Sequence, residues 1–241
     1  MVTPPVARKE MRGQSFIELA IALPILLLLL AGMLEVGFLF FAYMTAVDQT
    51  REAARFASTR DYEQLNPATI DPAHPEAACH DAFLHYFYDT ACFFTDRDIN
   101  PTLPISATRF EDVTISVFTI AGAAPGSGPR QVLHRYPEDG DGVWSLYNNN
   151  WTRDCEGNTV LSEPFFTNDE ILGMLQPDPT PDPGGGTYSR FDRGLVLVEV
   201  FFCYEQKMGL LDFRSMDRLI PNPMRLHAYT IMPAPEALPQ P

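Results

Sequence analysis

"QSFIELAIALPILLLLLAGMLEVGFLFFAY", residues 14–43, decides the fold of this 241-residue chain. From Phe16 to Tyr43 the only charged side chains are Glu18 and Glu35. An α-helix rises about 1.5 Å per residue, so about 20 apolar residues cross a hydrocarbon core of about 30 Å. The run is therefore long enough to span a membrane and to tilt within it.

The main competing interpretation is a secretory signal peptide that is removed. Its apolar part would be only about 7–15 residues long and would end at a small-residue cleavage site. The run is longer, and residues 44–58 (MTAVDQTREAARFAS) read as more helix, so we expect a retained single-pass span in the cytoplasmic (inner) membrane. Arg8, Lys9 and Arg12 precede the span and, by the positive-inside rule, keep the N-terminus cytoplasmic. The rest of the chain is then extracytoplasmic.

The residues after the span predict an α+β domain. Apolar side chains near a 3.6-residue period extend the first helix to about residue 60, either as a spine for this domain, which we favour, or as an isolated solvated helix. A second helix is predicted from about residue 75. Alternating or continuous apolar runs predict strands at residues 108–122, 130–136, 194–206 and 224–232. We expect a mostly antiparallel sheet of about three to five strands.

The domain organisation follows from these elements. We expect a cytoplasmic leader at residues 1–13, a transmembrane and extended helix at 14–60, and an extracytoplasmic domain at 61–241 with an insertion at about 137–189. Within the insertion, Thr167 and Glu170 form a capping box that predicts the start of a short helix. The aromatic residues Trp144, Tyr147 and Trp151 of the insertion would suit a binding surface.

The four cysteines all lie in the part placed outside the cell membrane, where disulfides form and persist. They are Cys79, Cys92, Cys155 and Cys203, and the alternative is four reduced, buried thiols. There is no CxxC pair, which argues against a zinc knuckle or a thioredoxin-like site. If residues 76–90 form one helix, Cys79 and Cys92 lie on the order of 20 Å apart, too far to be bridged. We therefore favour two long-range disulfides, with Cys203 in one of them.

Charge and motifs argue against several classes of function. The net charge of −14, from 17 Lys+Arg and 31 Asp+Glu, argues against a nucleic-acid partner, which needs clustered positive charge. The sequence contains no HExxH, no GxSxG and no phosphate-binding loop. Asp81 and His85 are four residues apart, and we interpret them as an exposed polar pair rather than a metal or cysteine-protease site. We predict no enzymatic activity, no metal and no cofactor.

The residues around Gly13 carry a specific resemblance. After Gly13, Gln14 is the first residue and Glu18 is the fifth. A glycine, a cut and a glutamate at the fifth position of an apolar helix resemble the processing signal of type IV prepilins, whose basic leader is removed by a membrane aspartyl peptidase. Residues 12–58, with Arg12-Gly13-Gln14-Ser15, Glu18, Pro24, Glu35, Gly37 and REAARFAS, resemble the N-terminal signature of TadE-like proteins. These are pseudopilins of tight-adherence pilus systems.

The resemblance implies a role for Glu18. Cleavage after Gly13 would give Gln14 a free α-ammonium, which Glu18 of the same or a neighbouring subunit can reach one helical turn away. Such pairing offsets the cost of a charge in the bilayer, about 2.5–3.5 kcal/mol at the centre of a helix, and makes Glu18 a device for helix register and assembly. The alternative is an acid favoured by the helix dipole that reaches the headgroups. For Glu35 we favour the outer interface over burial against a partner.

Two functional interpretations remain. The resemblance implies a membrane-anchored pseudopilin or minor pilin of a tight-adherence (type IV pilus-like) system, acting in pilus assembly or adhesion after leader removal at Gly13, in the membrane or in an extracellular pilus. Its partners would be the membrane, a prepilin peptidase, and other pilins or the pilus assembly machinery. The alternative is an unprocessed, signal-anchored extracytoplasmic binding protein or adhesin.

Overall fold

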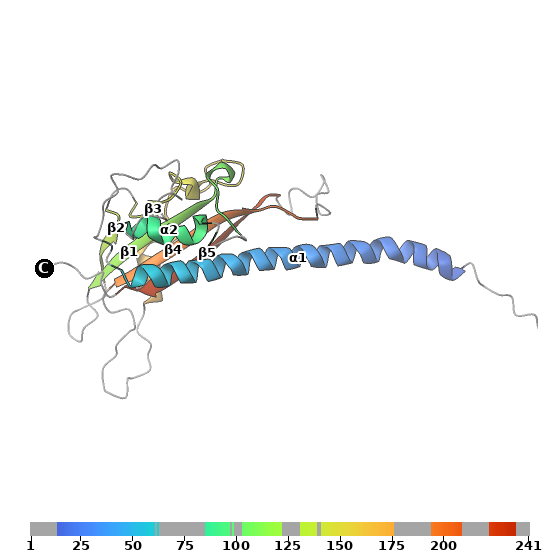
Figure 1. Ribbon diagram of the computed structural model, residues 1–241, viewed down its shortest axis with the longest axis horizontal. Helices are drawn as coiled ribbons and strands as arrows, with labels where there is room; N and C mark the ends of the chain where they lie inside the picture. The colour runs from blue at the N-terminus through green and yellow to red at the C-terminus, as the bar shows by residue number, and fades with distance from the viewer. Residues whose placement is uncertain are drawn as a thin grey trace, which may run out of the picture. The chain divides into compact units, whose positions relative to one another are not determined.

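The computed structural model describes residues 14–60, 62, 85–96, 98, 103–121, 131–138, 141–175, 194–208 and 222–234. Its first element, α1 (Gln14–Ser58), is one continuous helix that contains Pro24 (Figure 1). The chain divides into two compact units, and each is described by itself. Unit 1 combines residues 1–40 with 206–222, and unit 2 combines residues 41–205 with 223–241.

Unit 2 is built on an antiparallel sheet of five strands. These are β1 (Asp112–Ala121), β2 (Gln131–Tyr136), β3 (Trp144–Ser145), β4 (Gly194–Tyr204) and β5 (Met224–Pro233). Their order is β2-β1-β4-β5, and the short strand β3 also pairs with β1. The α+β class and the antiparallel sheet are confirmed, whereas the sequence did not predict β3.

Strand β4 is central because it is apolar on both faces. All eleven of its residues are buried, and Val198 lies in register between Ile115 of β1 and Thr230 of β5. Side chains alternate between the faces of a strand, so these three point to one face. There Thr230 Oγ1 lies 2.9 Å from Thr50 Oγ1 of α1. The outer end of α1 therefore packs on this face of the sheet and is not an isolated solvated helix.

The contact side of α1 is lined with alanine. Ala46, Ala53, Ala54 and Ala57 are fully buried, and their small side chains let the helix backbone approach the sheet closely. Helix α2 (Tyr86–Thr95) adds to this layer, since the ring centroids of Phe56 on α1 and Phe93 on α2 are 5.4 Å apart.

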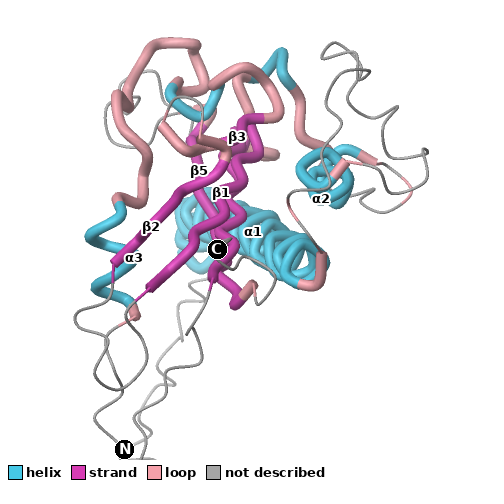
Figure 2. The backbone as a smooth tube through the Cα atoms, turned by 90° about the vertical axis from the view of Figure 1, so that its left-hand side faces the viewer, coloured by secondary structure: helices cyan, strands magenta, loops and turns pink. Residues whose placement is uncertain are grey.

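The opposite face of the sheet is covered by the insertion. Its helix α3 (Asn168–Met174) begins with the predicted capping box, in which Thr167 caps the backbone N–H of Glu170 and the Glu170 side chain accepts from Thr167. Figure 2 shows α3 beside β2. The core between insertion and sheet consists of Phe118, Ile120, Phe166, Ile171, Leu175, Leu195 and Leu197.

The second predicted helix begins later than its apolar spacing indicates. His85 has an extended backbone (φ −136°, ψ 92°) and α2 starts at Tyr86, so residues 76–90 do not form one helix. The geometric reason for keeping Cys79 and Cys92 apart therefore fails. An apolar period marks the buried side of a segment and does not show where an extended residue interrupts it. Residues 75–84 lie outside the described residues.

Candidate functional site: the apolar helix and the buried carboxylates

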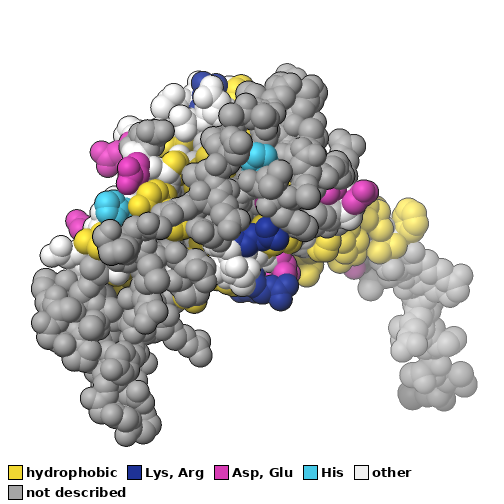
Figure 3. Space-filling view, turned by 60° about the vertical axis from the view of Figure 1, so that its left-hand side comes forward, with side chains coloured by type: hydrophobic (Ala, Val, Ile, Leu, Met, Phe, Trp, Pro, Cys, Tyr) yellow, Lys and Arg dark blue, Asp and Glu magenta, His cyan; other side chains and the backbone are white. Residues whose placement is uncertain are grey.

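The part of α1 in unit 1 is exposed and apolar. Large hydrophobic side chains from Phe16 to Phe40 are accessible around the helix, and Figure 3 shows hydrophobic side chains (yellow) gathered along α1 at the right. Within the described residues, this is one helix that is long and apolar enough to cross a membrane. Buried apolar surface is what stabilises soluble folds, so an exposed run of this length fits membrane anchoring.

The predicted cleavage and register residues lie at the start of this helix. Gly13 is outside the described residues, and Gln14 is the first residue of α1. Glu18 lies four residues further on and its side chain is exposed, about 6 Å along the helix axis at the usual rise. Both Gln14 and Glu18 of the predicted signal are therefore part of α1.

Glu35 makes a contact that the sequence did not predict. Its side chain is only 5% exposed, and each carboxylate oxygen accepts a backbone hydrogen bond. Lys207 N–H donates to Oε1 (2.9 Å) and Met208 N–H donates to Oε2 (2.8 Å). All three residues belong to unit 1. Glu35 is therefore buried against the connection that follows β4 of its own chain.

Asp112, the first residue of β1, fastens the insertion to the sheet. Its carboxylate accepts hydrogen bonds from Ser145 Oγ–H (2.6 Å), Tyr147 N–H (3.0 Å) and Trp151 N–H (3.0 Å). The side chain is fully buried, and this burial raises the pKa of Asp112 to about 6, against the lowering effect of its hydrogen bonds. Three donors from the insertion thus converge on one strand residue.

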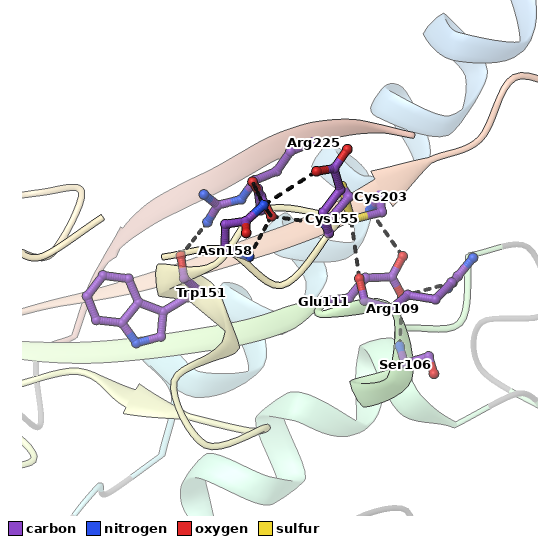
Figure 4. Close-up of a disulfide and its surroundings, with 10 residues drawn as sticks. Ser106, Arg109, Glu111, Trp151, Cys155, Asn158, Cys203 and Arg225 are labelled. Carbon is purple, nitrogen blue, oxygen red and sulfur yellow. Dashed lines mark hydrogen bonds and ion pairs between the residues drawn. A yellow bond between two sulfur atoms is a disulfide. The ribbon is translucent and has the colours of Figure 1, made fainter. Parts of the chain in front are cut away.

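Glu111 forms a second buried junction, next to a disulfide (Figure 4). Its carboxylate accepts from Cys203 N–H (3.1 Å) and Ser106 N–H (2.8 Å) and pairs with the Arg109 guanidinium at 2.8 Å. Burial raises the pKa of Glu111, while these donors and Arg109 lower it. Cys203 is joined to Cys155 of the insertion, with 5.8 Å between their Cα atoms. The disulfide and the carboxylate hold the same end of β4.

Glu199 is a third buried carboxylate, in the middle of β4. It is 2% exposed, lies 2.9 Å from His227 Nε2 of β5 and accepts a hydrogen bond from Thr114 Oγ–H of β1 at 3.3 Å. On the same face, Arg135 of β2 donates to the Phe166 carbonyl at 2.9 Å. Burial lowers the pKa of Arg135, and the charge of Glu199 raises it. Glu199 thus links β4 to β1 and β5, and Arg135 links β2 to the insertion.

The aromatic residues of the insertion are used in packing. Trp151 is buried and its indole N–H donates to Asn149 at 3.1 Å, while Arg225 donates to the Trp151 carbonyl. Trp144 stacks on Phe87 of α2 with ring centroids 5.5 Å apart. Of the three aromatic residues suggested for a binding surface, Trp151 is therefore buried, whereas Trp144 and Tyr147 are partly exposed.

The predicted disulfides are settled in part. Cys155–Cys203 is a long-range disulfide that includes Cys203, as favoured from the sequence. Cys92 is also disulfide-bonded, and Cys79 lies outside the described residues. Of the Asp81–His85 pair, only His85 is described; it is buried at the N-cap position of α2 and makes no capping side-chain hydrogen bond. The interpretation as an exposed residue is therefore wrong for His85.

The carboxylates have structural partners. In the part of the chain that the structure describes, no group of three or more His, Cys, Asp or Glu side chains is placed to hold a metal ion. A surface hollow of about 470 Å³ beside Arg135 is lined by four carboxylates: Glu138, Asp141, Glu163 and Asp169.

The sequence contains a partial signal for the buried carboxylates. Glu199 stands alone in the apolar run GLVLVEVFF, and the pair Glu111-Asp112 directly precedes an apolar strand. Charged residues in a buried strand need compensating partners, which could have marked all three. The groups that donate hydrogen bonds to these carboxylates lie elsewhere in the chain, and no sequence pattern marks them.

The match found in the comparison with known proteins falls on the first helix, α1. Comparisons with the curated proteins and with the solved structures find no match. Residues 13–55 match the model of the TadE-like protein family. This match confirms the resemblance for residues 13–55, and it supports an association of the protein with a tight-adherence pilus.

Proposed function

We propose that the protein is a membrane-anchored pseudopilin or minor pilin of a tight-adherence system, acting in pilus assembly or adhesion after its leader is removed at Gly13. The observation that carries this proposal is the TadE-like match over residues 13–55, which begins at Gly13, one residue before α1 starts. The matched segment thus includes the glycine of the proposed cleavage signal and most of the apolar helix.

The chemistry of the helix start supports assembly as the role of Glu18. After cleavage, the α-ammonium of Gln14 would lie about 6 Å along the axis from Glu18. A carboxylate and an ammonium near hydrocarbon each gain from being paired, because desolvation is costly for a lone charge. Pairing between neighbouring helices would fix their register, as a single buried polar residue does in a coiled coil.

The proposed location is the cytoplasmic (inner) membrane, with the leader cytoplasmic and unit 2 extracytoplasmic. The disulfide Cys155–Cys203 supports this orientation because disulfides persist in oxidising compartments. The proposed partners are a prepilin peptidase, other pilins or pseudopilins, and the pilus assembly machinery. The alternative of an unprocessed adhesin receives less support, since Trp151 is buried and Trp144 packs on α2.

The test is the mature N-terminus, measured by mass spectrometry on the membrane-extracted full chain with and without a co-expressed prepilin peptidase. We expect a chain that starts at Gln14 only when the peptidase is present, and no cleavage in Gly13→Leu. Gly37→Leu is the matched control, because a side chain added at Gly37 meets nothing within 4 Å. Persistence of Met1 in both wild-type samples would refute the processing and favour the anchored binding protein.

A further inference from the structure

The contact at Glu35 locates a second part of the chain relative to the span. Glu35 is flanked on α1 by the exposed apolar residues Leu34 and Val36, so it lies within the apolar surface of the helix. Both of its oxygens accept backbone N–H groups, from Lys207 and Met208. Whatever depth Glu35 has in a membrane, these two residues share it.

The length of the helix gives that depth. Glu35 follows Gln14 by 21 residues, which is about 32 Å along the helix axis at 1.5 Å per residue. This length equals the thickness of the hydrocarbon core within a few ångströms. With the start of α1 at the cytoplasmic surface, as the proposed function requires, Glu35 lies at the outer edge of the hydrocarbon. Lys207 and Met208 are then at the outer headgroups.

The side chains of Lys207 and Met208 are suited to the headgroup region. Lys207 and Met208 are both exposed, Met208 to 42%, although the Glu35 contact holds their backbone against the helix. A lysine ammonium binds the phosphates of anionic lipids, and the flexible apolar side chain of methionine suits the boundary with the acyl chains. The Glu35 carboxylate accepts from both backbone N–H groups, which would be costly to leave unsatisfied where the chain borders the hydrocarbon.

We propose that the start of the β4–β5 connection, at Lys207 and Met208, is a second membrane contact, which Glu35 holds at the lipid headgroups of the outer leaflet. The partner is the phosphate layer of the membrane that α1 crosses. The proposal rests on the membrane placement in the proposed function, but does not depend on leader cleavage. It assigns Glu35 the role of fixing how deeply the protein sits.

The experiment uses the full chain in vesicles of phosphatidylcholine and phosphatidylglycerol. Met208→Cys keeps the backbone N–H donor and is labelled with a small fluorophore; the unsubstituted chain measures background labelling. Lipids with a spin label on the headgroup quench fluorophores at the surface, and iodide quenches those in water. We expect the lipid quencher to remove about half of the emission, because its label lies at the interface, and iodide to remove much less.

Two further variants test the role of Glu35. Glu35→Leu removes both acceptors and keeps the helix apolar, so lipid quenching of the label at position 208 should fall and iodide quenching should rise. Glu52→Leu is the matched control on the same helix, since the exposed Glu52 pairs with its neighbour Arg55, and this change should alter neither quenching. Equal quenching in the Glu35→Leu and parent chains would overturn the role of Glu35.

A label on the span separates this inference from the proposed function. Leu26→Cys places the fluorophore in the middle of the apolar run, where lipids spin-labelled on the acyl chain should quench it. If the label at Leu26 is quenched and the label at Met208 responds only to iodide, the second contact is refuted while the anchored helix stands. If neither label is quenched by lipid, the membrane placement itself fails, and this inference fails with it.

Discussion

Asp112 provides the sharpest test of how the insertion is held. In Asp112→Ala, the Ser145 hydroxyl and the Tyr147 and Trp151 N–H groups lose their common acceptor. Each buried donor left without a partner costs roughly 1–3 kcal/mol. The side chain is fully buried, so water replaces it poorly. At that cost the three donors together give an expected loss of roughly 3–9 kcal/mol when the wild-type carboxyl is neutral.

The loss should depend on pH in an unusual direction. Burial raises the pKa of Asp112 from 3.8 to about 6, so the folded state binds a proton more tightly than the unfolded state. For such a group, the free energy of unfolding falls as pH rises from about 4 to about 6 and is constant above that range. Burying the charge lowers wild-type stability by about 2 kcal/mol between pH 4 and pH 7. The variant lacks this charge, so its disadvantage should be larger at pH 4 than at pH 7.

Urea unfolding of the full chain in detergent micelles measures this difference. Both tryptophans, Trp144 and Trp151, lie in the insertion, so their fluorescence reports on the region that Asp112 holds. The matched control is Asp48→Ala, which removes an exposed aspartate 3.5 Å from Arg51 and should change the stability by less than about 0.5 kcal/mol. A loss that is equal at both pH values, or larger at pH 7, would refute the charge-burial argument. A loss below about 0.5 kcal/mol at both would show that the three hydrogen bonds do not matter.

Three further predictions concern other fastenings of unit 2. Replacing Cys155 and Cys203 by serine opens a loop with a sequence separation of 48, and should lower the free energy of unfolding by about 4 kcal/mol; under reducing conditions the variant and the wild-type chain should show the same urea midpoint. Thr167→Ala should cost about 1 kcal/mol by removing the N-cap of α3, seen as a lower melting temperature without a change in the disulfide. Thr50→Val should cost about 1 kcal/mol by stranding Thr230, whereas Thr50→Val with Thr230→Val should cost less than the single change; additive losses in this double-mutant cycle would contradict the contact.

The sequence predicts the elements of this fold better than their connections. Strand β4 is an unbroken apolar run, and such runs indicate a strand buried on both faces, so its central place could be predicted. The capping box before α3 is equally local. The start of α2 was misplaced because the extended residue His85 interrupts a segment whose apolar spacing continues through it. The short strand β3 depends on pairing with β1 and has too few residues to form a pattern.

The contacts of the buried carboxylates could not be predicted, for a different reason. Asp112 meets donors 33 to 39 residues away and Glu35 meets donors more than 170 residues away. Backbone N–H groups are present at every residue except proline, so nothing in the sequence marks the ones that a carboxylate will use. A charge in an apolar run shows that some partner is needed, but it does not identify that partner.

The shared geometry of these carboxylates indicates what they contribute to the fold. Glu35, Glu111 and Asp112 each accept from at least two backbone N–H groups of other segments. Apolar packing alone tolerates shifts in register, whereas two convergent N–H donors fix one position of a loop on its support. A buried charge is often no more stabilising than an apolar replacement, and its advantage lies in specifying a single arrangement. Apolar substitution at these positions should therefore leave the sheet formed but let the insertion, or the connection after β4, dock in more than one way.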